Sequence, residues 1–224
     1  MRTAISLIVL LISSTGLAQT TRPAIVPARD WGSKPQAIPD SRRQIPKWIT
    51  IHHAGELWTG KKQPEEYLRS MQAWGQKEKH WADVPYHFLI APDGRIFQGR
   101  PIDLEPDSNT NYSLNGNIGI ELFGNFEVQR PSVEQLRSCV KLVAWLSQEY
   151  NIDLDHVRGH KDAAREQTVC PGKDFYRYLA DGTFRKWVET TLRGKTVEIQ
   201  PGAPLKDGPT DPIPTTMPTN STSK

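Results

Sequence analysis

The sequence contains few cysteines, no long apolar run and no large excess of charge of either sign. Its 224 residues include only Cys139 and Cys170, too few for a disulfide scaffold. Lysine and arginine number 28 and aspartate and glutamate 25, a net charge of +3 with no basic stripe, so nothing requires a nucleic-acid partner. A mean hydropathy of −0.57 excludes a polytopic membrane protein. Three roles are open for the two cysteines. They could form a disulfide, one of them could bind a metal while the other takes no part, or both could be buried thiols.

The first 18 residues have the pattern of a secretory signal peptide. An apolar run over residues 4–12 follows a basic start, and the small residues Gly16 and Ala18 predict cleavage after Ala18. The run is shorter than the roughly 20 apolar residues that a membrane anchor needs, and no cysteine follows the cleavage point to carry a lipid. We therefore expect an exported protein, periplasmic or secreted, that keeps no membrane anchor after cleavage and begins near Gln19.

The remaining chain is long enough for one sizeable core but hardly two. Residues 19–47 are rich in proline and predict an extended arm over the domain. Residues 201–224 contain six prolines and no aromatic side chain, so burial cannot offset the entropy lost on ordering. We expect residues 193–224 to be a disordered Pro/Thr-rich tail, with a partner-binding tail as the alternative, and residues 48–192 to form the single domain.

Strand and helix patterns alternate within this domain. Strands are indicated at 48–53, 86–90, 95–98 and 117–123, with a short one at 156–159. Helical spacing of apolar residues, with Pro64 at one start and a Ser132–Gln135 capping box at another, indicates helices at 64–78, 132–146, 173–180 and 183–192. Asp93-Gly94 predicts a hairpin turn. The fold class is therefore α/β, a mixed central β-sheet flanked by helices.

The histidines suggest a metal site. There are six of them: His52, His53, His80, His87, His156 and His160. His52 lies in the first predicted strand, and His160 and Cys170 lie ten residues apart. Two imidazoles and a thiolate suit a tetrahedral ion such as Zn²⁺, and three protein ligands leave a fourth position for water, which is the catalytic pattern. By spacing alone the pattern is weak, and satisfied core or surface histidines are the favoured alternative.

Seven local sequence blocks add a family resemblance. The first is the Ala-Arg-Asp-Trp-Gly arm at residues 28–32, and the others lie, in order, at residues 49–55, 81–88, 93–100, 118–121, 159–162 and 168–172. Together they resemble the zinc-dependent N-acetylmuramoyl-L-alanine amidases, which share a fold with peptidoglycan recognition proteins and with bacteriophage lysozyme-type amidases. The resemblance covers about residues 28–180.

The resemblance implies both a cofactor and an activity. The zinc ligands fall on His52, His160 and Cys170, and the reaction is hydrolysis of the amide between N-acetylmuramic acid and L-alanine in peptidoglycan or a muropeptide. We expect a monomer. The alternative is a non-catalytic recognition module that binds peptidoglycan; such modules typically lack a zinc ligand, often the cysteine, whereas this chain has all three. If Cys170 binds zinc, a 139–170 disulfide is excluded, and Cys139 is a buried core thiol.

The resemblance also implies auxiliary groups. Tyr86 occupies the family's catalytic tyrosine position, and Thr168 a position held by lysine or threonine. Glu121 falls where some bacterial members have a general base; strand alternation places it either toward the cleft or in solvent, and the two interpretations weigh evenly. His53 and His87 are candidate substrate-binding residues, with packing as the alternative for each.

Departures from the family pattern lie beside the predicted groove. Gly75 and His80 stand where members often have a histidine and a glycine, and Pro85 replaces a common glycine before Tyr86. These changes put selectivity for glycan and stem peptide in question rather than the metal site.

Overall fold

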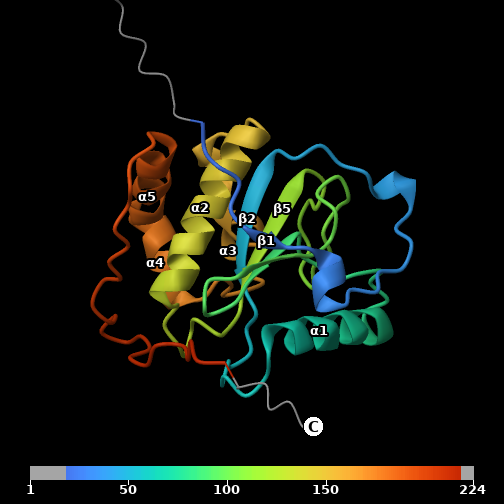
Figure 1. The fold of residues 1–224 in the computed structure, drawn as a ribbon, viewed down its shortest axis with the longest axis horizontal. Helices are drawn as coiled ribbons and strands as arrows, with labels where there is room; N and C mark the ends of the chain where they lie inside the picture. The colour runs from blue at the N-terminus through green and yellow to red at the C-terminus, as the bar shows by residue number, and fades with distance from the viewer. Residues whose placement is uncertain (1–18, 218–224) are drawn as a thin grey trace, which may run out of the picture.

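A computed structural model describes residues 19–217 (Figure 1); the expected signal peptide lies outside them. Six strands form one sheet in the order β1-β4-β3-β5-β2-β6. All neighbouring pairs are parallel except β3 and β4, so the predicted mixed sheet is confirmed. The strands are β1 (Ile25–Val26), β2 (Trp48–His53), β3 (Phe88–Ile90), β4 (Ile96–Gln98), β5 (Asn117–Leu122) and β6 (Val157–Gly159).

Side chains along β2 and β5 point alternately to the hydrophobic core and to the face of the sheet that carries the site. Ile49 and Ile51 of β2 are fully buried in the hydrophobic core, together with Ile118 and Ile120 of β5. The intervening residues point to the opposite face of the sheet. His52 and Glu121 are directly paired across β2 and β5 and therefore lie side by side on that second face.

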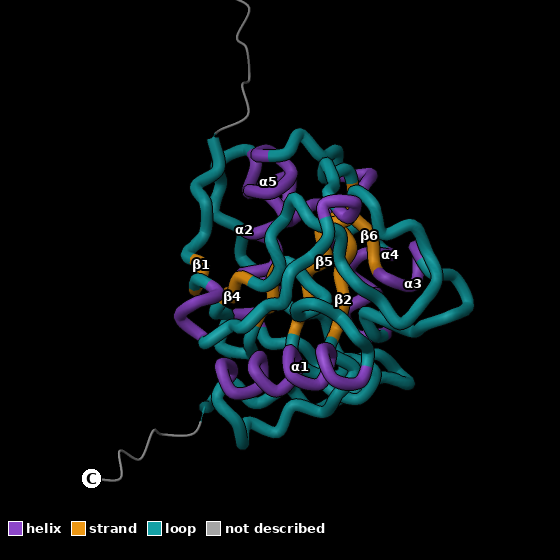
Figure 2. Tube along the Cα trace, turned by 90° about the vertical axis from the view of Figure 1, so that its right-hand side faces the viewer, coloured by secondary structure: helices purple, strands orange, loops and turns teal. Residues whose placement is uncertain are grey.

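Within residues 19–217, five α-helices accompany the sheet. They are α1 (Pro64–Glu78), α2 (Val133–Glu149), α3 (His160–Ala163), α4 (Lys173–Ala180) and α5 (Thr183–Leu192). Helices α2, α4 and α5 pack together, whereas α1 lies apart from them, near one end of β2 and β5 (Figures 1 and 2). Short 3-10 helices span Ala28–Trp31, Asp40–Arg42 and Leu154–His156.

The predicted capping box of α2 is present. Ser132 Oγ accepts a hydrogen bond from the Gln135 N–H at 2.9 Å, and Gln135 Oε1 accepts one from the Ser132 N–H at 3.1 Å. Ser132 Oγ also donates to Pro92 O at 2.6 Å, and Gln135 Nε2 to Phe123 O at 2.9 Å. The helix start is thus tied to the hairpin turn and to the end of β5.

The residues before β2 run over the domain. Trp31 is fully buried, and its indole N–H donates to Gln98 O at 2.7 Å. Strand β1 pairs with β4 and so extends the sheet. No helix among residues 19–217 is long and apolar enough to cross a membrane.

Residues 193–217, part of the segment expected to be a disordered tail, contact the domain at several points. Ile199 and Ile213 are only 4% and 2% exposed, and arginines of the domain donate to backbone carbonyls of this segment, among them Arg177 to Ala203 O. Val197 and Met217 also pack against the hydrophobic core, so apolar contacts and carbonyl hydrogen bonds both join this proline-rich segment to the domain. Residues 218–224 lie outside the described part.

Candidate metal centre and active site

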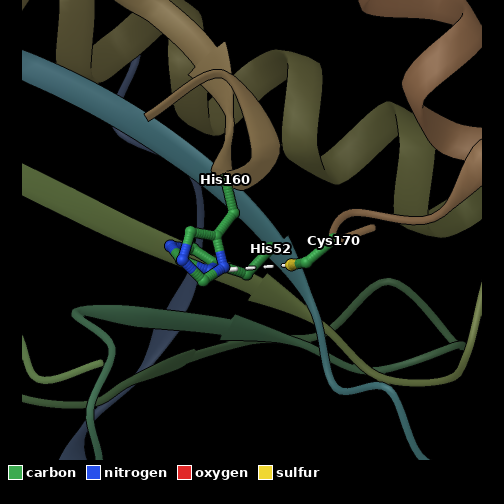
Figure 3. Close-up of side chains that lie close together, drawn as sticks. All are labelled: His52, His160 and Cys170. Carbon is green, nitrogen blue, oxygen red and sulfur yellow. Dashed lines mark hydrogen bonds between the residues drawn. The ribbon is translucent and has the colours of Figure 1, made fainter. Parts of the chain in front are cut away.

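The three predicted metal ligands converge on one point. His52 comes from β2, His160 is the first residue of α3, and Cys170 lies in the loop before α4. Their ligand atoms all lie within 4.8 Å of one another, and the side chains point toward one another (Figure 3). All three residues are buried.

The spacing of these atoms fits a tetrahedral ion. Cys170 Sγ lies 3.7 Å from His52 Nδ1. Zn–S and Zn–N bonds of about 2.3 and 2.0–2.1 Å at a tetrahedral angle would separate sulfur and nitrogen by about 3.6 Å. Burial, and then the neighbouring His160, lower the pKa of His52 well below its usual value, so its imidazole is neutral and able to bind a cation. The donor set and its spacing both suit zinc.

Backbone contacts fix Cys170 in this position. The Cys170 N–H donates to Thr168 Oγ1 at 3.0 Å, and Cys170 O accepts from the Lys161 N–H at 2.8 Å. The sulfur accepts a hydrogen bond from the His53 N–H at 3.3 Å. Burial raises the pKa of the thiol, so a thiolate here needs a cation beside it. Cys139 is buried elsewhere and Cys170 is free of any disulfide, which agrees with the predicted separate roles of the two cysteines.

His160 is oriented by a residue that the sequence did not indicate. Its Nε2 lies 2.6 Å from Thr110 Oγ1, which leaves Nδ1 as the nitrogen available to a metal. The ring of Tyr112 is 5.3 Å from that of His160. Thr110 lies in the irregular segment between β4 and β5, where no periodic pattern or motif marks it.

Tyr86 and Glu121 lie beside the cluster. The Tyr86 ring is 4.9 Å from that of His52, and Tyr86 and Glu121 line the same groove. Glu121 is 1% exposed, and its Oε1 has no hydrogen-bond partner. Burial raises its pKa well above the usual value, and the nearby Tyr86 side chain opposes this shift. The solvent-facing alternative for Glu121 is therefore wrong.

A glycine makes room for this arrangement. A Cβ atom at Gly119, on the same face of β5 as Glu121, would lie 3.3 Å from Tyr86 Cδ1 and 3.9 Å from His52 Nε2. Such spacing is tighter than ordinary van der Waals contact for the tyrosine ring. The bare backbone at Gly119 therefore allows the Tyr86 ring to lie against the sheet next to His52.

A groove opens above Tyr86 and Glu121. Its volume is about 350 Å³. Helix α1 contributes two aromatic side chains to it, and Trp74 is 46% exposed there. The residues that line it are Ala54, Glu56, Lys62, Tyr67, Ser70, Met71, Trp74, Trp81, Pro85, Tyr86, Asn109 and Glu121. Most were not predicted as site residues because the lining comes from five separate segments that only the fold brings together.

The structure places His87, a predicted substrate-binding residue, inside the protein. His87 is fully buried, its Nδ1 accepts a hydrogen bond from the Gly119 N–H at 2.9 Å, and its Nε2 donates to Leu104 O at 2.8 Å. Both nitrogens are occupied inside the protein. Burial lowers its pKa to about 4, in keeping with a neutral structural residue.

His53 is also almost completely buried and is hydrogen-bonded inside the protein. Its Nδ1 accepts from the Phe126 N–H at 3.1 Å, and the residue is 7% exposed. Of its two predicted roles, packing is the one these contacts favour. Thr168 uses its oxygen to accept from the Cys170 N–H, as described above, and its catalytic role stays a prediction.

A mixed sheet that carries this cluster next to Tyr86 and Glu121, two residues that line the groove, defines an amidase-like α/β domain. Residues 41–173 match the family model described as N-acetylmuramoyl-L-alanine amidase. The chain belongs to this family, as its sequence blocks indicated.

Relatives of two kinds are similar to this chain. Peptidoglycan recognition protein 1 of Mus musculus is 29% identical over 171 residues, which cover 75% of this chain and 92% of the relative. Peptidoglycan-recognition protein SA of Drosophila melanogaster is 32% identical over 188 residues, covering 80% and 90%. Among solved structures, the endolysin N-acetylmuramoyl-L-alanine amidase LysCS from Clostridium intestinale URNW has a TM-score of 0.57 at 28% identity, covering 73% of this chain and 98% of the endolysin. The predicted fold is confirmed.

Proposed function

We propose that the protein is a zinc-dependent N-acetylmuramoyl-L-alanine amidase acting on peptidoglycan or its fragments. The observation that carries this proposal is the complete ligand set of His52, His160 and Cys170 next to the Glu121–Tyr86 pair at the base of a groove. The family match and the endolysin likeness support the same reaction.

The ligands and the neighbouring groups have distinct parts in this proposal. His52, His160 and Cys170 hold the zinc ion, which supplies Lewis acidity toward the scissile carbonyl. Glu121 accepts the proton of the attacking water and returns it to the leaving amine, a task that suits a buried carboxyl group whose pKa is raised. Tyr86 holds Glu121 in place, and Thr168 offers a neutral hydrogen bond to the oxyanion.

A recognition module without catalysis is the second candidate, and the names of the relatives in mouse and fly favour it. Both candidates bind peptidoglycan or a muropeptide. The buried Glu121, with one oxygen unpaired, supports the enzyme, because desolvated carboxyl groups with perturbed pKa values cluster at catalytic sites.

The proposed substrate also indicates where in the cell the protein acts. Peptidoglycan lies outside the cytoplasmic membrane, and residues 1–18 fit a signal peptide. We propose an exported monomer, in the periplasm or the medium.

Purified protein incubated with peptidoglycan tests the proposal. The expected result is the appearance of new L-alanine amino termini, which a chelator and Cys170→Ala each abolish while peptidoglycan binding by Cys170→Ala persists. Binding without any release by the wild-type protein would instead identify a recognition module.

A further inference from the structure

We propose that the C-terminal strap, residues 197–217, braces one wall of the groove and thereby sets the affinity for muropeptide. The strap runs from the end of α5 to the loop that precedes α1 (Figure 1). It lies beyond residues 41–173, which match the family model. The effect on affinity rests on the proposed function, whereas the bracing itself does not.

The strap is seated on the segment that follows β5, the bridging loop of residues 124–130. Ile213 is 2% exposed, and its N–H donates to Arg130 O at 2.9 Å. In return the Arg130 N–H donates to Asp211 O, also at 2.9 Å. A Cβ atom at Gly124 would lie 2.5 Å from Ile213 Cδ1, so the glycine leaves the space that the isoleucine fills.

Charged side chains clamp the middle of the strap. Arg130 and Arg177 both donate to Gly202 O, and Lys173 Nζ donates to Asp207 O at 2.8 Å. The two arginines are held in turn by the fully buried Asp174, at N–O distances of 3.4 and 3.7 Å. Because this carboxylate is desolvated, its attraction for the arginines is little screened by solvent.

The bridging loop holds the groove loop, residues 54–63. The Gly55 N–H donates to Gly124 O at 3.1 Å. Gln129 forms two bonds with Trp58, accepting from its N–H at 2.9 Å and donating to its carbonyl at 2.8 Å. Asn125 Nδ2 donates to Gly55 O at 2.8 Å. The groove loop therefore depends for its position on the loop that the strap covers.

The strap also touches the groove loop directly. A Cβ atom at Gly60 would lie 3.0 Å from Thr216 O and 3.4 Å from Pro214 Cβ. The same loop sends Glu56 and Lys62, a carboxylate and an ammonium group, to the lining of the groove. Release of the strap would let this wall move while the ligand cluster, built on β2, α3 and the Cys170 loop, keeps its own contacts.

The test replaces Ile213 by aspartate, which opposes its burial. Thr210→Asp, an exposed position in the same strap, is the matched control because it adds the same charge without removing the contact. Ile213→Ala is the milder variant for the case in which Ile213→Asp does not fold. Hydrogen exchange at the Gly55 and Trp58 amides measures the bracing, and muropeptide binding to Cys170→Ala, with and without the strap change, measures affinity.

We expect both Ile213 variants to speed exchange at Gly55 and Trp58 and to weaken muropeptide binding about tenfold, with kcat within about twofold and zinc content unchanged. Thr210→Asp should leave all of these as in the wild type. Unchanged exchange and affinity in the Ile213 variants would overturn the proposal, as would equal effects in the control. A wild-type chain that cleaves nothing would refute the proposed function alone, since exchange and binding are measured without turnover.

Discussion

At the scale of single residues, Glu121 carries the most specific expectation. It is buried beside Tyr86 and next to His52 across two strands, so Glu121→Gln keeps the shape and removes the proton acceptor. We expect kcat to fall about 10²- to 10⁴-fold with KM little changed. Steady-state kinetics on a muropeptide measure this effect, with the exposed Glu149→Gln as control. A variant with wild-type kcat would show that Glu121 has only a structural part.

Thr110 should tune the metal site through His160. A ligand histidine is oriented by the hydrogen bond of its other nitrogen, and loss of such a partner costs about 10- to 100-fold in metal affinity. We expect Thr110→Val to weaken zinc binding by that factor and Thr110→Ser to retain it, because serine keeps the oxygen that lies 2.6 Å from Nε2. Competition with a chromophoric chelator measures the affinity. Equal affinities in all three proteins would contradict this role.

His87 should make stability depend on pH. Its pKa falls from a usual value of 6.5 to about 4 in the folded protein, chiefly through burial. A histidine with a lowered pKa contributes its stability fully above 6.5, and this contribution is lost as the pH falls toward 4. Between pH 7 and 5 the wild-type free energy of unfolding should therefore drop by roughly 2 kcal/mol more than that of His87→Gln.

Urea unfolding at pH 5, 6 and 7 measures this difference. The zinc ligands are common to both proteins, so their protonation cancels in the comparison. Parallel pH profiles for wild type and His87→Gln would contradict the assignment of His87 as a buried neutral residue.

The sequence indicated the three candidate metal ligands, but it did not indicate which side chains surround Glu121 and His87. His52, His160 and Cys170 lie in contiguous blocks that the resemblance covers, and the structure brings them together as predicted. Alternation indicates which face of β5 Glu121 occupies but not what covers that face. The same limit applies to His87, whose two hydrogen-bond partners come from β5 and from the segment between β4 and β5.

At the scale of elements, Ser132 at the start of α2 both caps the helix and binds the hairpin turn. Ser132 Oγ accepts from Gln135 N–H and donates to Pro92 O, and both contacts are buried. We expect Ser132→Ala to lower the free energy of unfolding by roughly 1–2 kcal/mol, measured by urea denaturation. Ser132→Thr, which keeps the hydroxyl, should recover most of the loss. Equal stability of the alanine variant and the wild type would contradict the capping role.

Elements with a regular pattern were predictable, and those without one were not. The capping box and the helical spacing gave α2, α4 and α5 close to their observed bounds, and strand alternation gave β2 and β5. The strap has neither pattern. It is held by separate contacts, such as Ile213 on Gly124 and Lys173 on Asp207, which depend on the assembled domain rather than on local sequence.

At the scale of the whole molecule, the parts of the site meet on one face of the sheet, near the C-terminal ends of β2 and β5. Strand β2 delivers His52, the α3–α4 region delivers His160 and Cys170, and β5 delivers Glu121. Helix α1 and the groove loop wall the space above them, and the strap holds that loop from outside. The residues that line the groove come together only in the folded chain. The sequence alone therefore did not reveal the substrate preference.

The most direct test of the central claim is the mass of the products from one defined muropeptide. We predict two fragments, a sugar bearing a free lactyl carboxyl group and a peptide beginning with an L-alanine amine. Both should vanish with a chelator, return with added zinc, and stay absent in Cys170→Ala. Intact muropeptide recovered from the zinc-loaded wild-type protein, or cleavage that continues with metal removed, would contradict this claim.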